Sequence, residues 1–166
     1  MPTSIYLAVP VMIVLGVVET AVLPHFPILG STPQLALLVA LAWGLLFGME
    51  EGAVWAFFAG IFTDLYSITP MGVSSFAFMV GVTAVLWAQQ AFPTSRVLIP
   101  LALAALATVI SFIIDVVLLR LFGTIATFQS VSLLPNTILI NVLAILPIYW
   151  LLYIINRTIQ PRRVQM

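Results

Sequence analysis

The 166-residue chain contains no cysteine, no lysine and only one histidine, His25. The absence of cysteine excludes disulfides, thiolate chemistry and cysteine-ligated metal sites, and one histidine gives little basis for a metal site built from imidazoles. Charged residues make up only 6% of the chain, and the net charge is zero. The composition therefore gives no electrostatic support for a nucleic-acid partner. We expect no metal, no cofactor and no nucleic acid.

Hydrophobic residues, in contrast, make up 63% of the chain. Soluble proteins carry roughly 25% charged residues, so this composition is typical of a bundle of membrane helices. Apolar runs separated by proline and glycine predict one all-α membrane domain, residues 1–166, with six transmembrane helices. The helices are expected at about residues 4–23, 33–47, 50–66, 73–91, 97–122 and 135–157.

Two ladders of small residues run through the second and third of these helices. Their members are four residues apart and share a helix face: Ala36, Ala40, Gly44 and Gly48 form the first ladder, and Gly52, Ala56 and Gly60 form the second. Small residues let two helix backbones approach closely in lipid. One helix from Pro33 to Tyr66 would be ~50 Å long, which exceeds a hydrocarbon core of roughly 30 Å. We therefore expect a break between Gly48 and Gly52 and a tight hairpin with the ladders opposed.

Six spans place both termini on the same side of the membrane. Arginines gather on that side, at Arg96, Arg157, Arg162 and Arg163. The positive-inside rule makes this side cytoplasmic and predicts an N-in, C-in topology. Aromatic residues are expected to form an interfacial belt on the same side: Trp43, Trp55, Trp87, Trp150 and Tyr153.

Most of the other polar residues fall toward the opposite, outer side. Glu19, Asp64, Asp115 and Arg120 lie near the outer ends of the first, third and fifth helices. Charges within spans usually face the bundle interior or water and pair with one another. These four residues are therefore candidates for an outward pocket or a partner contact, although residues near helix ends can also simply reach the headgroups. Asp115 and Arg120 are five residues apart and are not expected to face each other.

Two further features are interpreted as structural. Pro70 and Gly72 mark a turn after the third helix. Asn136 and Asn141, on the sixth helix, are expected to form hydrogen bonds across the bundle.

The two aspartates raise the possibility of an intramembrane aspartate protease, because two carboxylates that share a proton can activate water. Asp64 lies in Ile61-Phe62-Thr63-Asp64-Leu65, and Asp115 lies in Phe112-Ile113-Ile114-Asp115-Val116. Neither segment contains the motifs that accompany the aspartates of intramembrane proteases. We therefore expect no catalytic residues.

The central part of the chain resembles the bacterial rod shape-determining MreD family. The matching features, in order, are Leu23-Pro24-His25-Phe26-Pro27, Thr32-Pro33-Gln34-Leu35-Ala36-Leu37-Leu38, the glycines Gly44, Gly48, Gly52 and Gly60, Asp64, and Pro70-Met71-Gly72. The resemblance implies a non-catalytic scaffold in the bacterial inner membrane that takes part in cell elongation. Its implied partners are MreC and, in a larger complex, RodA and a class B penicillin-binding protein.

The family is similar in fold to the S components of energy-coupling-factor transporters, which bind micronutrients in an outward pocket. The alternative function is therefore a substrate-binding S component, in which Glu19, Asp64, Asp115 and Arg120 would contact the ligand. The small-residue docking motifs of those proteins lie on the first helix, whereas here Ala36 and Ala40 lie on the second. Because fold likeness does not carry function, we favour the scaffold.

Overall fold

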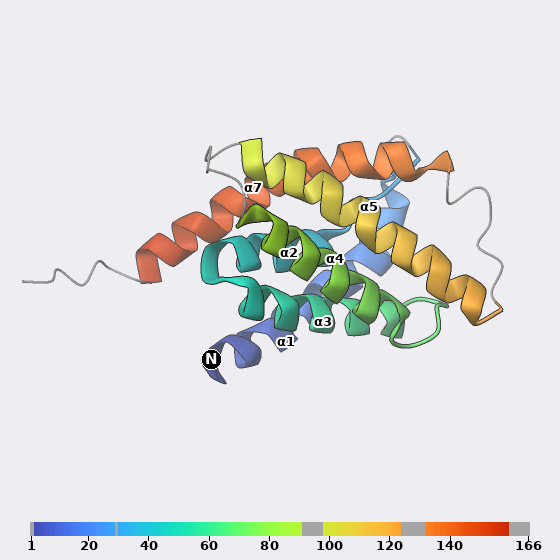
Figure 1. The fold of residues 1–166 in the computed structure, drawn as a ribbon, viewed down its shortest axis with the longest axis horizontal. Helices are drawn as coiled ribbons and strands as arrows, with labels where there is room; N and C mark the ends of the chain where they lie inside the picture. The colour runs from blue at the N-terminus through green and yellow to red at the C-terminus, as the bar shows by residue number, and fades with distance from the viewer. Residues whose placement is uncertain (1, 29, 91–97, 124–131, 160–166) are drawn as a thin grey trace, which may run out of the picture.

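The computed structural model describes residues 2–28, 30–90, 98–123 and 132–159. In these ranges it contains six α-helices and no strand (Figure 1), which confirms the all-α six-helix prediction. The helices are α1 (Pro2–Val17), α2 (Leu35–Phe47), α3 (Met49–Leu65), α4 (Val73–Gln89), α5 (Leu98–Leu121) and α7 (Leu134–Ile159). α1 continues into a π turn (Val18–Val22) and a 3-10 turn (Leu23–His25). α7 contains Pro147 and is bent along its length (Figure 1), because proline removes a helical hydrogen bond.

α2 lies at the centre of the bundle. It packs against each of the five other helices, and every residue from Ala36 to Ala42 is buried. Its 13 residues rise only ~20 Å, which is less than a hydrocarbon core of roughly 30 Å. Because protein surrounds α2, the short helix does not leave its backbone facing lipid.

The α2–α3 hairpin turns at Gly48, whose φ of +107° lies in the region that favours glycine. On either side of the turn, Gly44 and Gly52 face each other. A Cβ atom added to Gly52 would lie 2.8 Å from the Gly44 Cα. The two ladders therefore meet near the turn, as expected. Gly48 was expected to pack within its ladder, but nothing lies within 4 Å of a Cβ built there, because the chain has already reversed direction.

Farther along α3, the second ladder faces α4 instead of α2. A Cβ atom added to Gly60 would lie 2.2 Å from the Ser75 Cα. A row of residues four apart drifts by ~40° per step around a helix, so Gly52 and Gly60 point in different directions. The ladder, which includes the buried Ala56, thus packs against two helices. A Cβ atom at Gly52 would lie 2.8 Å from both the Gly44 backbone of α2 and the Leu86 side chain of α4, and one at Gly60 would meet the backbone of α4.

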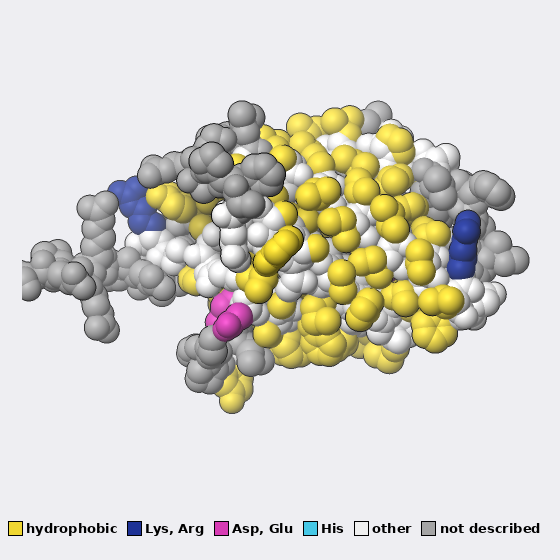
Figure 2. Space-filling model, viewed as in Figure 1, with side chains coloured by type: hydrophobic (Ala, Val, Ile, Leu, Met, Phe, Trp, Pro, Cys, Tyr) yellow, Lys and Arg dark blue, Asp and Glu magenta, His cyan; other side chains and the backbone are white. Residues whose placement is uncertain are grey.

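Different helices begin and end at the two opposite ends of the bundle, which are called here the terminal end and the distal end (Figure 1). At the terminal end, α1 begins, α2 turns into α3, and α7 ends. At the distal end, α3 and α5 end, and α2, α4 and α7 begin. Figure 2 shows an apolar face between these ends, with charged side chains only toward the ends. Among the described residues, three segments are long and apolar enough to cross a membrane: Tyr6–His25, Ile99–Leu121 and Leu134–Arg157.

The aromatic residues of the terminal end do not form one belt. Trp55 is only 1% exposed and stacks on Trp43, with ring centroids 3.9 Å apart. Trp87 and Trp150, in contrast, are exposed and are placed as interfacial residues would be. Trp55 was expected in the belt, but it belongs to the core because its face of α3 packs against α2. Arg96, Arg162 and Arg163, which support the predicted topology, lie outside the described residues.

Candidate functional site

Glu19 lies in the π turn that continues α1, at the distal end of the bundle. Its Oε2 accepts a hydrogen bond of 3.1 Å from the backbone N–H of Ala36. This N–H group belongs to the first turn of α2, where a helix has no acceptors of its own. A carboxylate on α1 therefore caps α2, and its negative charge meets the positive end of the helix dipole.

Asn141 of α7 completes this capping arrangement. Its Oδ1 accepts a hydrogen bond from the N–H of Gln34, and its Nδ2 donates to Gln34 Oε1 and to Thr108 Oγ1, each at 2.9 Å. Asn141 is fully buried. The predicted cross-bundle hydrogen bond of Asn141 is thus confirmed, and it joins α7 to α2 and α5.

Asp64 performs the same task for α4. It lies in the last turn of α3 and is 2% exposed. Its carboxylate accepts hydrogen bonds from the N–H of Gly72 at 2.8 Å, the N–H of Ser74 at 3.2 Å and the Thr69 hydroxyl at 3.1 Å. Gly72, predicted as a turn residue, has a φ of +97°, and this left-handed conformation starts α4. Asp64 therefore holds both the α3–α4 turn, which includes Pro70, and the first turn of α4.

The other two candidates, Asp115 and Arg120, have different surroundings. Asp115 is partly buried on α5, and its Oδ1 has no hydrogen-bond partner within the described ranges. Its carboxylate is close enough to Asp64 for the two charges to interact. Arg120 is exposed near the end of α5. The four candidates therefore share the distal end but do not converge on a single pocket.

The arrangement has no sign of a metal centre in the part of the chain that the structure describes. No group of three or more histidine, cysteine, aspartate and glutamate side chains there could hold a metal ion. The donors to Glu19 and Asp64 are backbone N–H groups and a hydroxyl, which stabilise a helix start.

Three residues that take part in these hydrogen bonds were not identified from the sequence as candidates: Gln34, Thr69 and Thr108. Gln34 precedes the first residue of α2, but its side chain makes no capping hydrogen bond and glutamine is not a preferred residue there, so the position gave no signal for its contact with Asn141. Thr69 lies in the turn that contains Pro70 and Gly72. Thr108 gives no local signal, because its role depends on how α5 packs against α7.

Comparison with known proteins identifies the family of the chain. The family model described as rod shape-determining protein MreD matches residues 3–159. No curated protein and no solved structure matches the chain. Because the match covers nearly the whole sequence, the chain belongs to the MreD family and has a role in rod shape determination. Together with the three long apolar helices, this membership identifies it as a membrane protein.

Proposed function

We propose that this MreD-family protein is a non-catalytic scaffold of the cell-elongation complex in the bacterial cytoplasmic membrane. In this proposal it crosses the membrane six times, binds MreC, and supports peptidoglycan synthesis by RodA and a class B penicillin-binding protein. The observation that carries the proposal is the internal use of the distal polar groups. Glu19, Asp64 and Asn141 all bind helix starts within the chain.

What the bundle offers to a partner is therefore mainly apolar helix surface. Side chains along the outer faces of the spanning helices are exposed, including Val14 on α1, Ile113 on α5 and Leu143 on α7. Helices in lipid associate through packing and a few polar contacts, so such faces suit a partner with a spanning helix. The sequence suggested that Glu19 and Asp64 could contact this partner directly, but their hydrogen bonds inside the bundle favour a supporting role.

The geometry also supports a non-catalytic function. An aspartate dyad requires two carboxylates that share a proton and act on one water. Both oxygens of Asp64 instead accept hydrogen bonds from Gly72, Ser74 and Thr69. Asp64 therefore has little remaining capacity to position a water against Asp115.

The proposed orientation places both termini in the cytoplasm and the distal end outside. The chain has no cysteine, so a single introduced cysteine reports its own side of the membrane. A membrane-impermeant maleimide added to spheroplasts should label Phe26→Cys at the distal end. It should label Glu50→Cys at the terminal end only after permeabilisation. The reverse pattern would show that the bundle is inverted.

The proposed function is tested by purifying the chain from its native membrane in mild detergent and identifying the associated proteins by mass spectrometry. We expect MreC, with RodA and a penicillin-binding protein in the larger complex. An unrelated membrane protein of similar abundance, purified in the same way, is the control. Recovery of an ATPase pair with a coupling membrane subunit, without MreC, would instead identify a transporter component.

A further inference from the structure

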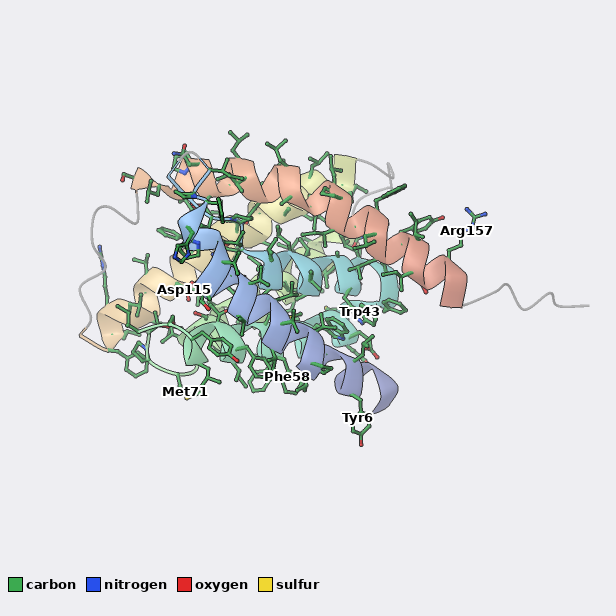
Figure 3. All side chains as sticks on the ribbon, turned by 180° about the vertical axis from the view of Figure 1, so that it is seen from behind. Tyr6, Trp43, Phe58, Met71, Asp115 and Arg157 are labelled. Carbon is green, nitrogen blue, oxygen red and sulfur yellow. The ribbon has the colours of Figure 1, made fainter. Side chains whose placement is uncertain are left out.

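Asp115 lies on the face of α5 that packs inside the bundle. Thr108 and Ser111, on the same face, are each only 1% exposed, and Asp115 follows Ser111 by about one turn. The Ser111 hydroxyl donates to the Ala77 carbonyl of α4 at 3.2 Å. α4 and α5 run antiparallel, because the next turn of α4, at Gly81, faces the preceding turn of α5. One turn beyond Ser111, Asp115 is therefore placed beside the first turn of α4, among the helices at the distal end (Figure 3).

The backbone donors at the start of α4, from Gly72 to Ser74, are already used. The N–H groups of Gly72 and Ser74 donate to Asp64, and the N–H of Val73 donates to the Pro70 carbonyl at 3.3 Å. Hydrogen bonds from backbone N–H groups to a carboxylate are charge-assisted. Asp64 therefore already supplies the negative charge that the start of α4 favours.

Asp115 lacks such partners. Its Oδ1 is buried and has no hydrogen-bond partner within the described ranges, and the nearby charge is that of Asp64. α5 packs against α2, α4 and α7. α2 and α4 contain no charged or titratable side chain, and the sequence from 122 to 133 contains none either. Those of α7 lie toward its terminal end, at Tyr149, Tyr153 and Arg157.

A second negative charge at this helix start is unfavourable for two reasons. Like charges at short range repel strongly where the dielectric is low, and two neighbouring carboxylates do not readily ionise together. A buried carboxylate oxygen without a donor also loses its hydration without compensation. Arg120 does not offset these costs, because it is exposed and lies ~140° around α5 from Asp115. A proton on Asp115 removes the second charge and reduces both costs.

We infer that Asp115 is a proton-binding site, and that its neutral side chain lets α5 pack beside the start of α4 that Asp64 caps. Loss of the proton places two carboxylates side by side and loosens the first turn of α4. Asp115 is thus a positioning residue that makes this part of the bundle sensitive to pH. The proposed function enters only through its orientation, which places the distal end, and so the exchanging proton, on the outer side.

The direction of the pH effect follows from proton binding. An aspartate in the unfolded chain is ionised near pH 7, since its ordinary pKa is about 4. The folded chain therefore binds one proton more than the unfolded chain, and raising the pH favours unfolding. The stabilisation is present while Asp115 keeps its proton and is lost as the proton leaves the folded protein.

The protonation state can be measured directly because the chain has only two aspartates, Asp64 and Asp115. An NMR-active carbon isotope at the aspartate side-chain carboxyl gives two signals from the full chain in mild detergent. At about pH 7 we expect one carboxylic acid and one carboxylate. Asp115→Asn should remove the acid signal and keep the carboxylate. Two carboxylate signals, or an acid signal that persists in Asp115→Asn, would show that Asp115 holds no proton.

Thermal unfolding tests what the proton does. Between about pH 6 and about pH 9, the melting temperature of the unmodified chain should fall by about 3 °C or more beyond any fall in Asp115→Asn. Asparagine resembles the neutral acid in shape, and this variant keeps His25 and every other titratable group. Glu50→Gln, which changes an exposed carboxylate at the terminal end, should retain the pH dependence of the unmodified chain. Hydrogen exchange at about pH 9, relative to Asp115→Asn at the same pH, should be faster at residues 72–76.

Both results are required. An acid signal from Asp115 together with the extra loss of stability supports a proton-binding site that positions α4. Equal pH dependence of the unmodified chain and Asp115→Asn overturns it. If Asp115→Asn does not fold, the two signals of the unmodified chain, followed over the same pH range, still decide whether a carboxyl group releases a proton. None of these measurements involves MreC, so their failure leaves the proposed scaffold role standing, and a failure to recover MreC leaves the proton site standing.

Discussion

Gly60→Ala is expected to lower the stability of the bundle by about 3 kcal/mol, at the upper end of the range for overpacked sites. A Cβ atom at this position would lie 2.2 Å from the Ser75 Cα, 2.3 Å from its N and 2.5 Å from the Ser74 carbonyl carbon. All three are backbone atoms of α4, so no side-chain rotation can relieve the contact. The two helices have to separate along their whole crossing. Thermal unfolding in mild detergent should show a melting temperature roughly 5–10 °C lower.

Gly16→Ala is the matched control for this prediction. It makes the same chemical change and gains the same helix propensity, about 1 kcal/mol in favour of alanine. Here the added Cβ would meet side-chain atoms, Tyr66 Cδ2 at 3.1 Å and Phe62 Cβ at 3.4 Å. A side chain can move by a few tenths of an ångström, so we expect a change within about 1 kcal/mol. Equal melting temperatures for the two variants would show that the α3–α4 crossing tolerates separation.

The contrast between these glycines shows what local sequence can predict about the fold. The four-residue spacing places Gly52 and Gly60 on one stripe that wraps slowly around α3, and helix length requires the break near Gly48. Both follow from the geometry of a single helix, and the structure agrees. Which neighbour each glycine meets depends on how the ladder wraps around α3, and that requires the positions of the other helices. The spacing therefore predicted the contact of Gly52 with α2, but not the contact of Gly60 with α4.

The polar candidates show the same limit. The cost of charge within a span indicated that Glu19 and Asp64 would have partners. Their partners are backbone N–H groups, at Ala36 for Glu19 and at Gly72 and Ser74 for Asp64. Every residue except proline carries such a group, so the sequence does not mark the ones that are used. The common pattern, in which a carboxylate near the end of one helix caps the next, was visible only in the structure.

The local sequence pattern also did not predict which of the large aromatic residues are buried. Tryptophan near a helix end is typical of the membrane interface, and Trp87 and Trp150 are exposed accordingly. Trp55 occupies a similar position along its helix, but it stacks on Trp43 inside the bundle. The difference arises because α3 lies between α2 and α4 and has little free surface on that face.

Asp64→Ala is expected to destabilise the protein by about 3–5 kcal/mol. The substitution removes the acceptor for the N–H groups of Gly72 and Ser74, and a hydrogen bond to a charged group contributes about 1.5–3 kcal/mol. The Thr69 hydroxyl can still bond to Ser67, so it adds little. We expect the first turn of α4 to fray. Hydrogen exchange should show faster exchange at residues 72–76, together with a lower melting temperature in mild detergent.

Two variants show whether the loss comes from the cap itself. Asp64→Asn keeps one oxygen acceptor and should lose about half as much stability, since only part of the hydrogen bonding is removed. Glu50→Ala removes an exposed carboxylate at the terminal end and should change stability by about 1 kcal/mol or less. If Asp64→Ala unfolds at the same temperature as Glu50→Ala, the cap is dispensable.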